Sequence, residues 1–173
     1  MYDDTNRNVT TLGDLDTGGI KTTTVVHYDD QRRETLRQTT DDNGVLGINV
    51  ETRYRNGSNS RYKLTSNPYR SYSDSTMGWS VVTLDTAGRV VSEESFAGQT
   101  LPQPWGANAA SLGATMYSYL GNTGTVTEPD NGSGITVTRS STTDGAGRLT
   151  QVVDGSGTTI NSYDALDNLT GVT

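Results

Sequence analysis

The side chain best suited to acid–base or metal chemistry near neutral pH is a single histidine, His27, in a sequence of 173 residues. Imidazole titrates close to physiological pH and binds metal ions, but both roles require partner residues. His27 stands beside Tyr28 in a run of β-forming residues, and the chain has no second histidine and no cysteine. We therefore interpret His27 as a strand-surface or packed residue.

Carboxylates are the next candidates, because acidic residues recur in adjacent pairs such as Glu93-Glu94. A glycosidase needs two carboxyl groups at a set separation, whereas acidic pairs on turns and strand faces are usually solvated. The segment from Asp14 to Gly19 has part of a calcium-loop pattern, but Gly18 and Val25 replace the required oxygen ligands. We expect no catalytic residue, no metal site, no cofactor and no enzymatic activity.

Two tryptophans could stack on sugar rings through their aromatic faces. Trp79 lies in a predicted strand and is expected in the core. Trp105 lies between Pro104 and Gly106 in a Gly- and Ala-rich segment, 96–112, which is predicted to be a loop-like insertion. Because loops carry recognition more often than frameworks do, Trp105 is the candidate surface residue for binding a glycan or a cell surface.

The composition indicates a strand-rich protein with a thin core. Leu, Ile, Val and Phe account for 31 residues and Thr for 29, with nine Tyr and a net charge of -7. Thr and Tyr suit a pleated, half-buried surface. The acidic balance argues against a nucleic-acid partner, since phosphate binding needs a basic surface, and no apolar run is long enough for a membrane span.

The elements that must position these residues are short strands separated by turn signals. The predicted strands are 21–28, 34–39, 48–54, 79–84, 89–94, 115–120, 125–128, 135–140, 149–153, 158–163 and 169–173. Asn-Gly and Asp-Gly pairs and Gly-rich stretches stand between them and tolerate the positive φ of tight hairpin turns. Only 107–112 has helical propensity, and at most one short turn is expected there. The prediction is an all-β meander.

The same short pattern returns along the chain: an aromatic or β-forming residue, Asp, two residues, then Gly-Arg-Leu or a variant of it. The signature residues are Tyr2, Asp3, Tyr28, Asp29, Asp85, Gly88, Arg89, Asp144, Gly147, Arg148, Leu149, Tyr163, Asp164 and Leu169. Tyr54 continues the spacing of Tyr2 and Tyr28, although Arg55 replaces the Asp. Asp in such a unit can accept hydrogen bonds from turn amides, and Tyr adds an apolar body with a hydroxyl that can stay hydrated.

This pattern resembles the tyrosine-aspartate (YD) repeat, also called the RHS repeat, of Rhs proteins, insecticidal toxin-complex subunits, wall-associated proteins and teneurins. The resemblance covers most of the chain and is strongest in "DGAGRLTQVVDGSGTTINSYDALDNLTGV". It fades over 56–77. Asn6, Arg32 and Asp167 stand where the family usually has Gly.

The resemblance implies a single repeat array over 1–173, built of stacked antiparallel hairpins in a continuous, curved or spiralling sheet. Such a sheet forms part of a β-shell or an open-ended β-fibre, because hairpins too poor in apolar residues to stand alone pair with neighbours. The expected function is a non-catalytic structural scaffold in an extracellular or cell-surface setting. The alternatives are a glycan-binding or adhesion module and a fragment of a shell that encloses a toxic polypeptide.

The expected partners are neighbouring YD repeats or further copies of the chain, which would pair through exposed strand edges. Further repeats of a longer protein, or identical copies joined head to tail, are expected to cover the ends of the stack.

Overall fold

The computed structural model describes residues 2–3, 8–14, 21–41, 47–107, 109–130, 132 and 135–173, of which 2–3, 8–14 and 21 are described by their backbone. These residues form strands, turns and irregular segments. No helix in this part of the chain has the length and hydrophobicity needed to cross a membrane.

The strands form one antiparallel sheet in which each strand pairs with the one before it and the one after it in sequence. They are β1 (Tyr2–Asp3), β2 (Asn8–Asp14), β3 (Lys21–Tyr28), β4 (Glu34–Asp41), β5 (Ile48–Asn56), β6 (Arg61–Ser66), β7 (Gly78–Leu84), β8 (Val90–Ala97), β9 (Ser111–Leu120), β10 (Thr123–Thr127), β11 (Thr138–Thr143), β12 (Leu149–Asp154), β13 (Gly157–Tyr163) and β14 (Leu169–Val172). The predicted fold class is confirmed.

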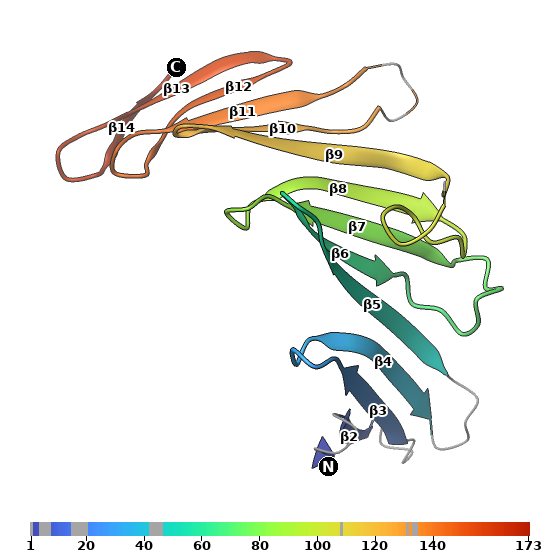
Figure 1. The fold of residues 1–173 in the computed structure, drawn as a ribbon. Coiled ribbons are helices and arrows are strands. Elements are labelled where there is room, and N and C mark those ends of the chain that lie inside the picture. Colours follow the sequence, from blue (N-terminus) through green and yellow to red (C-terminus); the bar gives the residue numbers. More distant parts are fainter. Residues whose placement is uncertain are drawn as a thin grey trace.

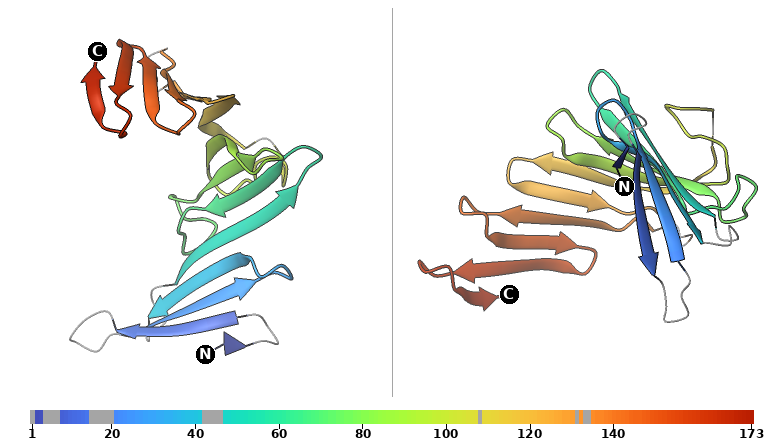
Figure 2. Two further views of the ribbon diagram at one scale, coloured as in Figure 1. Left: turned by 90° about the vertical axis from the view of Figure 1, so that its left-hand side faces the viewer. Right: turned by 90° about the horizontal axis from the view of Figure 1, so that it is seen from below.

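The sheet is open and strongly twisted, as Figures 1 and 2 show, and its first and last strands lie far apart. Among the described strands, contacts join only sequence neighbours, so the sheet does not close into a barrel. Right-handed twist between adjacent strands accumulates along such a meander and gives the spiralling shape.

Two sequence predictions need correction. β6 was not predicted, because no Tyr-Asp pair precedes it. The expectation of at most one short turn over 107–112 agrees with the structure, in which Ser111 and Leu112 belong to β9 and the described residues beside them are irregular. The strand predicted over 135–140 begins later, at Thr138, because its partner β10 ends at Thr127 and pairs with it there.

A hydrophobic core lies against one face of β6–β8. Its buried members are Leu64, Tyr69, Met77, Trp79, Val81 and Phe96. The segment 98–110, between β8 and β9, covers this face: its Leu101, Trp105 and Ala109 pack against the core, and Pro102 is fully buried. Trp79 is 1 % exposed, as expected for a core residue. The predicted insertion therefore acts as the cover of the core.

The meander places its connections alternately on two opposite rims of the sheet. One rim carries the turns at 29–33, 57–60, 85–89, 121–122, 144–148 and 164–168. The opposite rim carries, among its described connections, 67–77, 98–107 and 155–156. Four of the turns on the first rim contain the Asp of the repeat signature, so the chain order itself gathers these residues along one edge of the molecule.

Candidate functional site

Within the residues that the structure describes, the repeat signature forms the same five-residue turn four times. Each turn runs from an Asp to the Arg or Asn four residues later, and we call this turn the aspartate clasp. The clasps are 29–33, 85–89, 144–148 and 164–168. In each of them the amide of the Asp donates to the carbonyl of the last clasp residue, at 2.9 to 3.0 Å. The same Asp carbonyl accepts from the amide of the fourth residue.

One carboxylate oxygen of each clasp Asp accepts hydrogen bonds from backbone amides. In the clasp 144–148, Oδ1 of Asp144 accepts from Ala146 at 2.9 Å and from Arg148 at 3.0 Å. The corresponding bonds to the last residue of the other clasps are 2.9 Å long, from Arg33, Arg89 and Asn168. This is the Asx arrangement expected from the sequence.

The second carboxylate oxygen binds the side chain at the end of the clasp. Oδ2 of Asp144 accepts from both Nε and Nη2 of Arg148, each at 2.7 Å. Asp29 with Arg33 and Asp85 with Arg89 repeat the same fork at 2.7 to 2.8 Å. In the fourth clasp Asn168 takes the place of Arg, and its Nδ2 donates to Asp164 at 2.9 Å. The bonds to Asp thus hold the Arg side chain in one orientation within its own clasp.

The fourth residue of every clasp has positive φ. Gly88 and Gly147 adopt 85° and 83°, and the non-glycine residues Arg32 and Asp167 adopt 61° and 66°. The pairing register shifts at the Tyr, Leu or Thr that precedes each clasp, as in a hairpin closed by a bulge. The two departures from Gly therefore do not prevent the turn from forming.

The environment stabilises the ionised form of each clasp carboxylate. The pKa values of Asp29, Asp144 and Asp164 are lowered chiefly by the side-chain bond at the end of the clasp, from Arg33, Arg148 and Asn168. The pKa of Asp85 is lowered chiefly by its bond from the amide of Arg89. Each ionised carboxylate therefore accepts hydrogen bonds from within its own turn.

Each clasp Arg also contacts a tyrosine on the following strand. The guanidinium carbon lies over the ring of Tyr54 in β5 for Arg33, of Tyr119 in β9 for Arg89 and of Tyr163 in β13 for Arg148, at 4.3, 4.6 and 5.0 Å from the ring centroid. Cation–π contacts of this geometry are attractive. The ion pair within one hairpin thereby reaches the next hairpin.

Two of these tyrosines are also held by hydrogen bonds. The hydroxyl of Tyr119 donates to the carbonyl of Val90 at 2.9 Å, and that of Tyr163 donates to the carbonyl of Leu149 at 2.8 Å. Val90 and Leu149 each follow a clasp Arg directly. The strand before each of these two tyrosines thus supplies an acceptor for its hydroxyl.

The two adjacent clasps contact each other directly. Nη1 of Arg148 donates to Oδ1 of Asp167 at 2.6 Å and to the carbonyl of Asp164 at 3.3 Å. Arg148 thus binds Asp144 in its own clasp, Tyr163 on the next strand and the turn of the next clasp. The arrangement is a chain of contacts along the rim that fixes one hairpin on another.

The remaining signature residues lie in strands. Tyr2 and Asp3 form β1, and their side chains lie outside the described residues. Tyr28 pairs with Glu34 beside the first clasp, and Leu169 pairs with Tyr163 beside the last.

Sequence reasoning missed Arg33 and Tyr119. Arg33 could have been found, because it stands four residues after Asp29, as Arg89 does after Asp85. Tyr119 has no Asp after it, and only its place on the strand after a clasp Arg connects it with Tyr54 and Tyr163.

Trp105 is half-buried, and its ring meets that of Tyr62 edge to face at a centroid distance of 6.3 Å. Its binding of a glycan stays a prediction. His27 is half-buried in β3, where Nε2 lies 3.3 Å from Oε1 of Gln38. Asp14 ends β2, and the rest of the calcium-like segment, 15–20, lies outside the described residues.

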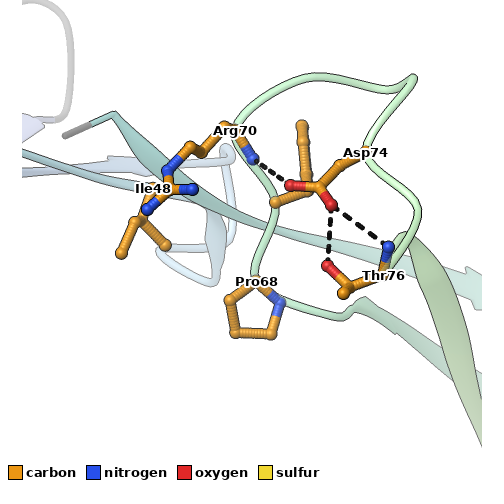
Figure 3. Close-up of a pocket in the computed structure, with 6 residues that line it drawn as sticks. Ile48, Pro68, Arg70, Asp74 and Thr76 are labelled. Atoms are coloured by element: carbon orange, nitrogen blue, oxygen red, sulfur yellow. Dashed lines mark hydrogen bonds between the residues drawn. The ribbon is translucent and has the colours of Figure 1, made fainter. Parts of the chain in front are cut away.

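A small cavity of about 190 Å³ lies at the opposite rim, lined by Ile48, Pro68, Tyr69, Arg70, Asp74 and Thr76 (Figure 3). Its one carboxylate, Asp74, accepts from the amide and hydroxyl of Thr76 at 3.1 and 2.9 Å. These bonds lower the pKa of Asp74, and they join two residues of the same loop. Within the described residues no group of three or more His, Asp or Glu side chains could hold a metal ion.

The C-terminal part of the chain is similar to a known protein family. The family model described as RHS Repeat matches residues 144–173, which contain both the third and the fourth clasp. No curated protein matches the sequence.

Proposed function

We propose that this RHS/YD repeat chain, matched over residues 144–173, is a non-catalytic structural protein, a segment of β-sheet wall in an RHS-type shell at or outside the cell surface. The observation that carries the proposal is the series of contacts along the clasp rim. Arg33, Arg89 and Arg148 each join their own hairpin to a tyrosine of the next strand. A wall needs this property, because its strength depends on the joints between repeats.

The distribution of apolar side chains supports the same role. The one cluster of buried hydrophobic residues among the described side chains lies at β6–β8, while large apolar residues such as Leu120 and Leu169 are more than half exposed. Hairpins without a core of their own depend on pairing with neighbours. Each further repeat adds backbone hydrogen bonds, and each clasp that ends in Arg adds an Arg–Tyr contact, without requiring a thicker core.

We further propose that the wall extends by strand pairing at its edge, with another YD repeat as the partner. Directly after β14, Thr173 exchanges both backbone bonds with Ile160, at 2.8 and 3.0 Å. Bonding alternates along an antiparallel pair, so the amide and carbonyl of Val172 point away from β13. The enclosed space of such a shell would hold a polypeptide, as the family resemblance implies.

A proline scan of β14 tests the extension. Val172→Pro removes an outward amide and leaves the β13–β14 bonds intact, while Ala165→Pro is a matched control at a turn position that favours proline. We expect the wild-type chain and Ala165→Pro to form end-to-end oligomers at rising concentration, seen by electron microscopy and light scattering, and Val172→Pro to stay shorter. A wild-type chain that stays monomeric, or equal growth of Val172→Pro, would contradict pairing at this edge.

A further inference from the structure

One face of the sheet from β9 to β13 carries no charged residue. The strand registers place the following side chains on this face: Met116, Ser118, Leu120, Thr123, Thr125, Thr127, Thr138, Ser140, Thr142, Gln151, Val153, Thr158 and Ile160. We call it the uncharged face. In a chain with 19 % charged residues, its composition sets it apart from the rest of the surface.

The opposite face of the same strands is charged. Arg139 pairs with Val126 there, and Asp154 pairs with Gly157. Tyr117 on that face donates to Oε2 of Glu93 at 3.1 Å. Charge is therefore segregated by face, with ions on one side and threonine, serine and aliphatic groups on the other.

The uncharged face is accessible. None of its residues is buried, and Met116, Leu120 and Ile160 are 51, 85 and 48 % exposed. Figure 2 shows β10–β14 as a single layer, and none of the described segments lies over it. Apolar atoms on this face remain in contact with water in the isolated chain, at a cost proportional to their area.

Four of the six threonine hydroxyls of this face are bonded to one another in pairs. Oγ1 of Thr123 lies 2.9 Å from Oγ1 of Thr142, and Oγ1 of Thr127 lies 3.3 Å from that of Thr138. A buried hydroxyl is costly only when it lacks a partner. Because these hydroxyls pair within the sheet, covering the face removes methyl groups from water without stranding these four hydroxyls.

The uncharged face continues the face that the molecule already buries at β6–β8. Trp79 pairs with Phe96 in β8, and Ser92 of β8, on the same face as Phe96, pairs with Met116 in β9. The segment 98–110 covers the β6–β8 part with Leu101, Trp105 and Ala109. From β9 onward, no described segment of the chain takes over this role.

We propose that a second copy of the chain covers the uncharged face. Two such faces pack without burying an ion, and their side chains interdigitate between sheets about 10 Å apart. The contact is isologous, because the same face of each copy forms the interface. It uses a sheet face, whereas the wall extension uses a strand edge, so the two proposals stand or fall separately.

The experiment compares two lysine substitutions on adjacent residues of β11 by sedimentation equilibrium. Ser140→Lys places a charge at the centre of the uncharged face, and Ser141→Lys places the same charge on the opposite face. Both are made in the Val172→Pro chain, which lacks pairing at the edge of β14, and we expect this chain to form a dimer whose dissociation constant changes little between low and high salt, because no ion pair is involved. Ser140→Lys should raise that constant about tenfold or more, because the charge would be buried unpaired, and Ser141→Lys should leave it nearly unchanged.

Met116→Lys repeats the test at an exposed position, where the fold tolerates the charge, and circular dichroism checks every variant. Because Val172→Pro removes the outward amide of β14, its dimer reports the face contact separately from pairing at the edge of β14. A strictly monomeric Val172→Pro chain, or equal weakening by Ser140→Lys and Ser141→Lys, would overturn the proposal.

Discussion

The fourth residue of the aspartate clasp shows how a single backbone angle shapes the hairpin. This residue has positive φ in all four clasps, with Gly in two of them and Arg32 and Asp167 in the others. A side chain in the left-handed region costs roughly 1–2 kcal/mol, less for Asp than for most residues. The remaining bonds of the clasp outweigh this cost, so the turn forms without glycine.

Arg32→Gly should therefore stabilise the chain. Relief of the strained φ favours the variant, while the greater freedom of glycine in the unfolded state opposes it, which leaves a net gain of about 0.5–1 kcal/mol. Gly147→Ala is the reverse change at the matching position and should cost about 1–2 kcal/mol. Urea unfolding followed by circular dichroism measures both. A loss of stability in Arg32→Gly would show that the arginine side chain contributes more than its backbone costs.

At the scale of the element, the clasp is a unit held by an ionised carboxylate. The folded-state pKa values of Asp29, Asp85, Asp144 and Asp164 lie below the ordinary value of 3.8. A lowered folded pKa means that the group stabilises the fold at every pH above its unfolded pKa. This contribution is lost as the pH falls below about 4, through the folded values.

Acid should therefore destabilise the chain through its clasps. We expect the urea midpoint of the wild type to be nearly constant from pH 7 to pH 5 and to fall below pH 4. Asp144→Asn should be less stable than the wild type at pH 7 and should lose less on acidification, because one titrating acceptor is gone. Glu94→Gln, outside the clasps, is the control. Parallel acid profiles for the wild type and Asp144→Asn would show that the clasp bonds add nothing to stability.

Local patterns allowed most elements to be predicted from the sequence. Turn residues and β-forming runs predicted the hairpins from the strand Lys21–Tyr28 onward. The Asp of each clasp was identified as well, together with its role as an acceptor of hydrogen bonds from turn amides. β6 was missed because neither a Tyr-Asp pair nor a Gly-Arg signature marks it. The contact of Arg89 with Tyr119 depends on strand pairing across 30 residues of sequence, including the segment 98–110, and no local pattern specifies it.

At the scale of the whole molecule, stability is concentrated in one region. Leu64 is 0 % exposed at the centre of the core on β6–β8, while Leu166 in the last clasp is 83 % exposed. The sheet beyond β9 depends on ladders and rim contacts. Repeat proteins of this kind unfold in segments whose stability follows the local interfaces.

Leu64→Ala should cost about 2–5 kcal/mol, because it opens a cavity in the core. Leu166→Ala should change the free energy of unfolding by no more than about 0.5 kcal/mol, because the side chain is exposed. Hydrogen exchange should show the slowest amides in β6–β8 of the wild type, with that protection lost in Leu64→Ala. Uniform protection along the sheet would contradict a single stabilising region.

The two rims of the sheet differ in how freely their connections vary in length. On the clasp rim, each of the first three clasps is followed by the next clasp directly or after one shorter turn, so the described turns there are all short. The opposite rim has connections of very different length, from 155–156 up to 67–77 and 98–110. Since the Arg–Tyr contacts all lie on the clasp rim, foreign peptides grafted at the opposite rim should leave the joints between hairpins undisturbed. Evolution, or a protein engineer, could decorate this scaffold from that side with new recognition loops and keep its architecture.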